Sequence, residues 1–285
     1  MSKRSRDRHL AKLAARRQAE RDAIRRRRQR ILTTIGAVVA IALVLAGGLN
    51  LLNKSPSDKA SATPTLTPSA SPTVKPGTQT GTVTPQPAPT TVACGAKAPP
   101  DAGKPKPQFA GPPPMTIDQS KTYIATVETS CGTIVIELDA KTAPQTVNSF
   151  VFLAEQGYFD GQYVHRLDTS IDVIQGGDPT GTGSGGPGYS IPDELTGKES
   201  YAPGVLAMAN AGPNTGGSQF FLITGPNGHN LDASPHYTIF GNVVKGLDVA
   251  QTIQQLPIQD PSAGIAGQQP KDAVYIDKVT ITEKK

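Results

Sequence analysis

The 285-residue sequence has few of the residues that build metal sites and nucleophilic active sites. It contains two cysteines and four histidines, with no Cys-x-x-Cys or His-x-x-x-His pair and no serine framed as Gly-x-Ser-x-Gly. Structural zinc sites and the nucleophile elbow of hydrolases need those patterns. We therefore expect no metal and no cofactor.

One glycine-rich stretch imitates a nucleotide-binding motif. Residues 181–186 read GTGSGG and match Gly-x-Gly-x-x-Gly, but Pro187 and Gly188 follow, so the stretch does not begin a helix. A phosphate site of that kind needs a strand before the motif and a helix after it. We interpret the stretch as a flexible surface loop.

The basic charge is confined to the beginning of the chain. Residues 1–30 hold 13 of the 28 Lys and Arg residues and 3 of the 23 acidic ones, which leaves 15 basic and 20 acidic groups in the rest. A nucleic-acid-binding domain would itself be basic. We therefore expect no nucleic-acid partner for the C-terminal part, and contact with anionic lipid headgroups for the tail.

An uncharged apolar run follows this tail. Residues 31–52 would span about 33 Å as a helix, enough for a hydrocarbon core of roughly 30 Å. Five arginines lie within residues 25–30, whereas Lys54 and Lys59 flank Asp58 on the other side. The positive-inside rule then predicts a single-pass protein of the cell membrane, with residues 1–30 in the cytoplasm and everything after Leu52 outside.

Residues 53–114 contain 15 of the 26 prolines and hardly any large apolar side chains. Such a composition predicts a disordered linker. Cys94 lies in this linker and Cys131 beyond it, both on the expected outer side, where disulfides persist. We favour a disulfide between them over two free thiols.

Residues 115–285 look like one mostly β domain. Short apolar or alternating runs, separated by Gly, Pro, Asn and Asp, favour an antiparallel sandwich or barrel. Helices are expected at 144–156, with Thr142 as N-cap, and at 247–256. The expected strands cover residues 123–127, 132–138, 163–167, 205–209, 219–223, 238–243 and 274–282.

The same domain carries polar residues suited to chemistry without a nucleophile. Arg166 lies in YVHRL, and Gln175 follows in IQGGDP. In GSQFFLIT, strand alternation puts Gln219 and Phe221 on one face and the neighbouring residues on the other. Each has an ordinary structural explanation alone, so the interpretation depends on their occurring together.

Five segments in this order resemble the cyclophilin family of peptidyl-prolyl cis-trans isomerases, and the whole chain resembles a membrane-anchored bacterial form. They are GTIVIELDAKTAPQTVNSFVFLAEQGYFDG, YVHRL, IQGGDPTGTGSGGPGYSIPDE, GVLAMANAGPNTGGSQFFLIT and YTIFGNVVKG. The resemblance covers residues 123–282. It implies an eight-stranded antiparallel barrel closed by two helices, with the active face outside the barrel, no cofactor, and proline-containing polypeptides as partners.

The resemblance also implies roles for individual residues. Arg166 matches the catalytic arginine, and Gln175 the glutamine that orients it. Gln219 matches a second amide that contacts substrate. The strip that pairs with the substrate backbone is expected at Ala209, Asn210 and Ala211. The walls and floor of the proline pocket are expected at Phe221, Leu231, Val173 and Tyr237.

Three departures bear on the pocket. The spacing between Arg166 and Gln175 is one residue longer than the family pattern, so Ile171 or Val173 stands near the pocket floor beside Asp172. Asn230 stands where many relatives have a tryptophan, which predicts weak or no cyclosporin binding. Near the pocket edge, either His236 or Tyr237 takes the family's His/Tyr position.

The sequence thus predicts an isomerase that assists the folding or assembly of extracytoplasmic proteins. Asp172 motivates an alternative, a cyclophilin-fold module that binds proline segments with little catalysis. A third hypothesis is a protein that interacts with the cell wall or a scaffold, in which the barrel only spaces partners.

Overall fold

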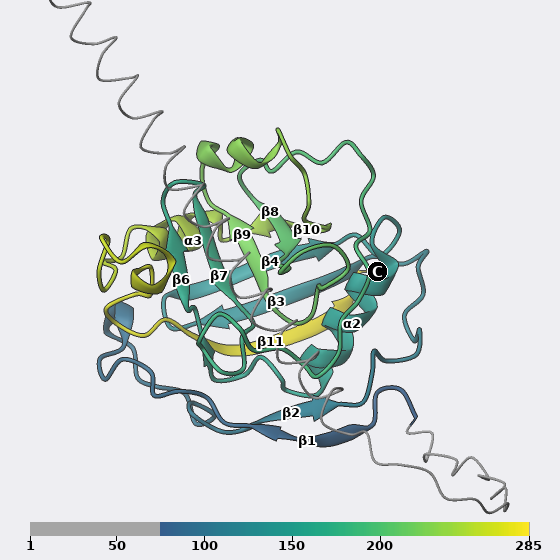
Figure 1. Cartoon of the computed structure of the whole chain (residues 1–285), viewed down its shortest axis with the longest axis horizontal. Coiled ribbons are helices and arrows are strands. Elements are labelled where there is room, and N and C mark those ends of the chain that lie inside the picture. The colour runs from purple at the N-terminus through teal and green to yellow at the C-terminus, as the bar shows by residue number, and fades with distance from the viewer. Residues whose placement is uncertain (1–74, 285) are drawn as a thin grey trace, which may run out of the picture. The chain divides into compact units, whose positions relative to one another are not determined.

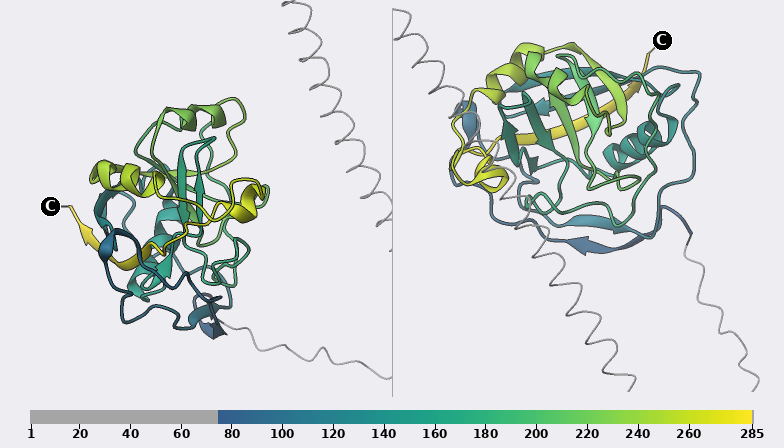
Figure 2. Two further views of the ribbon diagram at one scale, coloured as in Figure 1. Left: turned by 90° about the vertical axis from the view of Figure 1, so that its left-hand side faces the viewer. Right: turned by 45° about the horizontal axis from the view of Figure 1, so that its top comes forward.

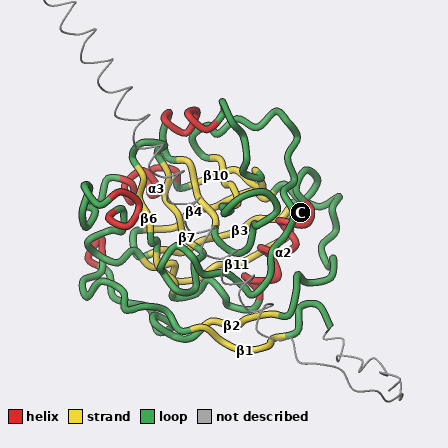
Figure 3. The backbone as a smooth tube through the Cα atoms, in the orientation of Figure 1, coloured by secondary structure: helices red, strands yellow, loops and turns green. Residues whose placement is uncertain are grey.

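The computed structural model describes residues 75–284. A nine-stranded antiparallel sheet curls around the core in the order β5-β11-β3-β4-β10-β8-β9-β7-β6 (Figure 1). Figure 3 shows how much of the chain between the strands is loop. The strands are β3 (Tyr123–Thr129), β4 (Gly132–Leu138), β5 (Gln162–Tyr163), β6 (Arg166–Asp168), β7 (Val173–Gly176), β8 (Val205–Met208), β9 (Phe220–Ile223), β10 (Ile239–Lys245) and β11 (Tyr275–Glu283).

The two edge strands of this sheet are consecutive in the chain. Only Val164 and His165 separate β5 from β6. The Val164 amide donates to the Val274 carbonyl at 2.8 Å, and the His165 amide donates to the Gln175 carbonyl at 3.1 Å, so this short segment contacts both ends of the sheet. Counted as one strand, residues 162–168 bring the number of strands to the expected eight.

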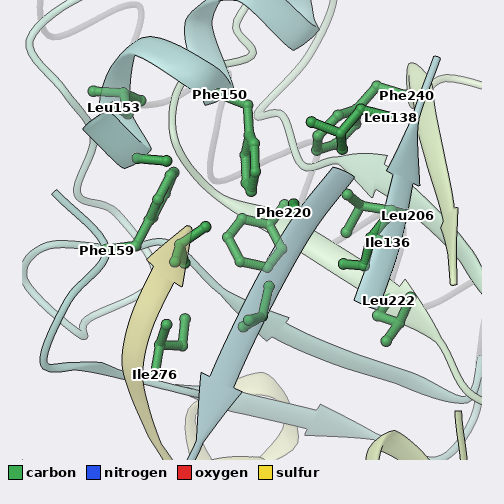
Figure 4. Close-up of a cluster of buried hydrophobic side chains, with 14 of the residues drawn as sticks. Ile136, Leu138, Phe150, Leu153, Phe159, Leu206, Phe220, Leu222, Phe240 and Ile276 are labelled. Carbon is green, nitrogen blue, oxygen red and sulfur yellow. The ribbon is translucent and has the colours of Figure 1, made fainter. Parts of the chain in front are cut away.

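The interior of the curled sheet is filled by aromatic and aliphatic side chains (Figure 4). Phe220 is central, with its ring 5.5 Å from that of Phe150 and 5.6 Å from that of Phe159. Phe150 belongs to α2 (Pro144–Glu155), whose predicted apolar face is buried throughout: Val147, Phe150, Val151 and Ala154. The second predicted helix is present as α3 (Leu247–Gln254).

The start of α2 differs from the prediction. Ala143, not Thr142, is the N-cap, and its side chain makes no capping bond. Instead the Glu194 carboxylate, from a distant loop, accepts the amides of Gln145 and Thr146 at 2.9 Å each. A carboxylate at this end also complements the helix dipole. The Thr142 amide is held by Asp139 in the preceding turn, at 3.0 Å.

The prediction of a disordered linker as far as residue 114 is wrong for residues 75–114. This segment, which we call the arm, contains β1 (Gln79–Val83) paired with β2 (Lys106–Phe109) along one side of the domain (Figure 2). A few buried side chains attach it to the domain despite its polar, proline-rich composition. Phe109 packs edge-on to Phe152 at 4.9 Å, and the buried Lys106 ammonium donates to the Asp160 carbonyl.

A disulfide joins the arm to the sheet. Cys94 and Cys131 are bonded, with their Cα atoms 5.2 Å apart. Cys131 lies in the turn between β3 and β4 and packs against the interior cluster. The folded domain therefore includes residues 75–114 as well as the predicted 115–284.

The predicted membrane span at 31–52, the basic tail and residues 53–74 lie outside the described residues. Between residues 75 and 284, no helix has the length and apolar character needed to cross a membrane.

Candidate active site

Three candidate site residues share one row across the outer face of the sheet, and Ala207 continues it. Arg166 on β6 pairs with Gln175 on β7, which pairs with Phe221 on β9, which pairs with Ala207 on β8. Residues directly opposite one another in antiparallel strands point to the same face. Two residues far from each other in the sequence, Arg166 and Phe221, are thereby placed two strands apart on one surface.

The inserted residue leaves this row intact. β6 and β7 are joined by the four-residue turn 169–172, and Asp168 pairs with Val173. Asp172 takes a left-handed backbone conformation, with φ of 48°. Its carboxylate accepts the Asn227 amide at 2.8 Å. The extra residue is accommodated in the turn, and the Asp172 side chain bonds to the 3₁₀ helix Pro226–Leu231.

Three acceptors hold the Arg166 guanidinium. Its Nη1 donates to Gln175 Oε1 at 3.0 Å, its Nη2 to Asp168 Oδ2 at 2.5 Å, and its Nε to Gln268 Oε1 at 2.7 Å. A guanidinium has five N–H donors. Two of the five therefore have no partner among residues 75–284, on a side chain that is 21% exposed.

Asp168 is nearly buried, at 5% exposure. Burial raises the pKa of its carboxyl, but bonds from the Ser170 hydroxyl and amide and the charge of Arg166 outweigh this and leave the pKa below its ordinary value. Asp168 thus remains the anionic partner of Arg166 at neutral pH.

A chain of amides continues from Gln175. Its Nε2 donates to Gln219 Oε1 at 3.0 Å, and Gln219 Nε2 donates to the carbonyls of Gly183 at 3.1 Å and Gly185 at 2.9 Å. Each side chain in this network therefore donates to the next one, from Arg166 through Gln175 and Gln219 to the two backbone carbonyls. The two side-chain amides that the resemblance assigned to the site, Gln175 and Gln219, are thus directly bonded to each other.

Beside this row lies a second, smaller apolar cluster. Phe221, Val173 and Tyr201 are buried in it, while Leu231 and Tyr237 are half-buried at its rim. The Tyr237 ring stands edge-on to Phe221, with centroids 5.1 Å apart and an interplanar angle of 90°. Val173, at 1% exposure, underlies the cluster.

Of His236 and Tyr237, it is Tyr237 that packs in this cluster. His236 is exposed, with its Nε2 2.7 Å from the Ser234 hydroxyl, whereas Tyr237 packs on Phe221. Tyr201 fixes that position, because its hydroxyl donates to the Tyr237 carbonyl at 2.8 Å and accepts the Tyr237 amide at 3.0 Å.

The predicted backbone strip borders the cluster. The Ala209 amide donates to the Gln219 carbonyl at 2.9 Å, and the Ala211 amide to the Thr215 hydroxyl at 2.8 Å. The Asn210 side chain donates to the His236 carbonyl at 2.7 Å. Within the described chain, neither the amide nor the carbonyl of the Asn210 backbone has a hydrogen-bond partner.

The family model for cyclophilin type peptidyl-prolyl cis-trans isomerases matches residues 124–281, more than half of the chain. The chain belongs to the cyclophilin family. Its enzymatic class is accordingly that of a peptidyl-prolyl cis-trans isomerase.

Curated relatives and solved structures agree with this membership. The chain is 42% identical to peptidyl-prolyl cis-trans isomerase-like 1 of Mus musculus over 163 residues, covering 53% of this chain and 94% of the relative. It is 46% identical to the protein of that name from Neurospora crassa over 135 residues, covering 46% of this chain and 80% of the relative. A cyclophilin-type isomerase of Cryptosporidium parvum superposes with a TM-score of 0.50 at 29% identity, covering 57% of this chain and 99% of that structure.

Three residues of this cyclophilin site were not predicted. Asp168 and Gln268 hold Arg166, and Tyr201 positions Tyr237. Asp168 is two residues from Arg166 on the same strand, so strand alternation placed it on the same face. Gln268 and Tyr201 come from loops, and no periodic signal in the sequence marks them.

Proposed function

We propose that this cyclophilin rotates X-Pro bonds in extracytoplasmic polypeptides, with Arg166 donating to the proline nitrogen as the bond twists. Rotation removes amide resonance, at a barrier of about 18–20 kcal/mol. The twisted nitrogen becomes a better hydrogen-bond acceptor than in either planar state. A fixed donor at that position therefore stabilises the transition state more than the ground states.

The two unpartnered guanidinium N–H groups of Arg166 carry this proposal. Asp168, Gln175 and Gln268 occupy the other three donors and restrict the orientation of the plane. The guanidinium stays charged at all physiological pH values. Arg166 is also the only arginine after Arg30 in the sequence.

The apolar cluster and the strip supply substrate binding in this proposal. A proline ring would pack on Phe221 between Leu231, Tyr237 and Ala209, with Val173 beneath. The free amide and carbonyl of Asn210 would pair with the peptide backbone next to the proline. The Cryptosporidium relative has a solved structure in the presence of the dipeptide Ala-Pro.

The test is the rate of cis-trans exchange of a short peptide with one Ala-Pro bond, measured by NMR with the full-length chain. Arg166→Ala should lower kcat/KM by about 10²–10³, the effect typical of removing a fixed donor at the reacting centre. Lys121→Ala removes an exposed cation that pairs with Glu283 and should change nothing. Equal rates for the wild type and Arg166→Ala would contradict the assignment.

The same experiment separates catalysis from binding alone. Asp172 suggested a binding module, but its carboxylate bonds to the Asn227 amide outside the apolar cluster. If the peptide bound to the wild type without any acceleration of exchange, the binding module would replace the isomerase.

We further propose that residues 31–52 anchor the chain and that the enzyme domain works outside the membrane. The uncharged run, the five arginines before it and the disulfide between Cys94 and Cys131 all support this location. A reporter that is active only in the cytoplasm, fused after Lys285, should be inactive. Activity of that fusion would reverse the orientation.

Weak cyclosporin binding is a separate proposal. Asn230 is exposed, and its Nδ2 donates to the Ser170 carbonyl at 3.1 Å, where a tryptophan would present an indole instead. Asn230→Trp should strengthen binding in a titration with the drug, while a wild type that already binds at nanomolar concentration would refute the proposal.

A further inference from the structure

Residues 181–188, which we call the glycine loop, line a groove that also includes the proposed substrate-binding strip Ala209–Ala211, and we call it the substrate groove. Gly183 and Gly185 line an open groove of about 370 Å³ together with Gln219 and Asn210. Their two carbonyls accept the Gln219 amide, which in turn bonds to Gln175. The position of Gln219 therefore depends on where the glycine loop holds those carbonyls.

The arm holds this loop near both of its ends. Gln86 Nε2 donates to the Gly181 carbonyl at 2.8 Å, and the Gln86 amide donates to the Thr180 carbonyl at 2.9 Å. At the other end, Gln108 Nε2 donates to the Gly186 carbonyl at 2.8 Å. The glycine loop thus lies between the arm, which bonds its ends, and Gln219, which bonds its middle.

Close packing accompanies these bonds. A Cβ atom at Gly188, whose φ is 92°, would lie 2.7 Å from the Phe109 carbonyl oxygen in the arm. A Cβ atom at Gly181, whose φ is 72°, would lie 2.1 Å from the hydroxyl of Tyr163, and that hydroxyl accepts Gln86 Nε2 at 3.0 Å. Glycine at position 188 allows the loop to approach the arm, and glycine at position 181 allows it to approach Tyr163 of β5, to which the arm residue Gln86 also bonds.

The loop needs such support because of its composition. Four of the six residues of GTGSGG are glycine, which loses more conformational freedom on ordering than any other residue. Just before the loop, the Asp178 carboxylate accepts the amide of Thr180, and it also accepts the amide of Gly183 within the loop, but residues 184–186 make no hydrogen bond to it. Bonds from the arm would lower the entropy lost when a substrate orders the loop.

We propose that Gln86 and Gln108 are positioning residues for the substrate groove, which they act on by fixing the glycine loop and, through it, Gln219. The proposal rests on the assignment of the groove as the site for proline peptides. It predicts an effect on substrate affinity, because neither residue touches Arg166. The arm, which the sequence presents as a spacer, is then a part of the enzyme's binding surface.

The experiment compares the full-length chain, purified in a mild detergent, with the double variant Gln86→Met, Gln108→Met. Methionine keeps the length of each side chain and removes the donor. We measure the Kd of the Ala-Pro peptide by NMR titration, KM and kcat by exchange, and hydrogen exchange of the Gly183 amide. Losing the two side-chain bonds to the glycine loop should raise Kd and KM about three- to tenfold, change kcat less than twofold and speed exchange at Gly183.

Gln79→Met is the matched control. Gln79 lies in β1 on the same hairpin, but its Nε2 donates only to the Gly81 carbonyl, at 3.3 Å, so all four quantities should stay unchanged. Faster exchange at Gly183 with an unchanged Kd would overturn the proposal, and so would an equal effect of Gln79→Met. If the double variant fails to fold, the single variants are compared in the same way.

The outcomes for the two proposals can be told apart. Kd is measured by binding, so a wild type that binds the peptide without accelerating exchange would end the proposed catalysis and leave this test valid. A wild type that turns over the peptide with the same KM as the double variant would end only the role of the arm. A wild type that does not bind the peptide would overturn both.

Discussion

The curled sheet carries two apolar clusters on its opposite faces, and the same strands build both. In β9, Phe220 and Leu222 point into the interior cluster, while Phe221 and Ile223 point into the outer one. In β8, Leu206 and Met208 face inward, and Val205 and Ala207 face outward.

The two clusters differ in how they are covered. The interior cluster is closed by α2 and by stacked rings such as Phe150 and Phe159, 4.9 Å apart (Figure 4). The outer cluster has a half-buried rim of Leu231, Tyr237 and Ala209, and neither α2 nor α3, the α-helices between residues 75 and 284, contributes to it. Burying the apolar surface that remains exposed at this rim would lower the free energy further, so a ligand that covers the rim is stabilised there. The interior cluster stabilises the fold, and the outer one presents a binding surface.

Neighbouring phenylalanines test this division most strongly. Phe220→Ala empties the centre of the interior cluster and should lower the free energy of unfolding by about 3–5 kcal/mol. Phe221→Ala should cost less stability, because its cluster is partly open, but should abolish measurable binding of the Ala-Pro peptide. Urea denaturation and NMR titration give the two quantities. Equal losses of stability with retained binding in Phe221→Ala would contradict the division.

Removing the disulfide should lower the stability of the fold without changing the binding surface on the outer face of the sheet. Cys94→Ser with Cys131→Ser opens a loop with a sequence separation of 37 and should cost about 2–4 kcal/mol of unfolding free energy. Cys131 packs on the interior cluster, and the arm's bonds to the glycine loop come from Gln86 and Gln108 rather than from Cys94, so kcat/KM below the melting transition should stay within twofold of the wild type. Thermal denaturation with and without reductant checks the first value. A loss of activity without any loss of stability would show that the bond serves the site.

Alternation and turn signals made the outer face predictable. Gln219 and Phe221 were placed on one side of their strand from the period of two, and the paired strands then set Arg166, Gln175 and Phe221 in one row. The effect of the inserted residue could not be predicted, because a turn or a shifted register accommodates an extra residue equally well. The register of Arg166 with Gln175 shows that the turn does so.

The roles of residues in loops and in the arm could not be predicted from the sequence. The arm has the composition of a linker, and only a few anchors such as Phe109 and Lys106 order it. Gln268 reaches Arg166 across a separation of 102 residues, with no hydrophobic period to mark its loop. Contacts of this kind depend on the tertiary arrangement, which local patterns do not encode.

His165 lies between the two edge strands and makes stability depend on pH. Burial lowers the pKa of its imidazole to about 4, from 6.5 in the unfolded chain. Between pH 6.5 and about 4 the unfolded state therefore binds more protons than the folded state. The contribution of His165 to the free energy of unfolding is complete above pH 6.5 and falls on acidification, with a limiting slope of about 1.4 kcal/mol per pH unit. Urea denaturation between pH 7 and 5 should show this slope, and His165→Leu should remove it.

A matched variant separates His165 from the other titrating groups. His236 is exposed, so His236→Gln should keep the slope of the wild type. The test compares how steeply the free energy of unfolding changes with pH in the two variants, and not how stable either variant is. An identical slope in His165→Leu would mean that the imidazole is not the group that titrates.

Asp168 should have the smallest effect, confined to the outer face. Asp168→Asn keeps the shape of the side chain and an oxygen for Ser170, but it removes the charge paired with Arg166 at 2.5 Å. The guanidinium would then be held by Gln175 and Gln268 alone, so we expect kcat to fall about three- to tenfold, the effect of weakening one charge-assisted bond. KM should change little, because the Asp168 carboxylate bonds to Arg166 and Ser170 and to no residue of the outer apolar cluster. Gln268→Ala should produce a similar fall in kcat through the Nε bond. If Asp168→Asn instead raised KM and left kcat unchanged, Asp168 would shape the groove rather than orient the donor.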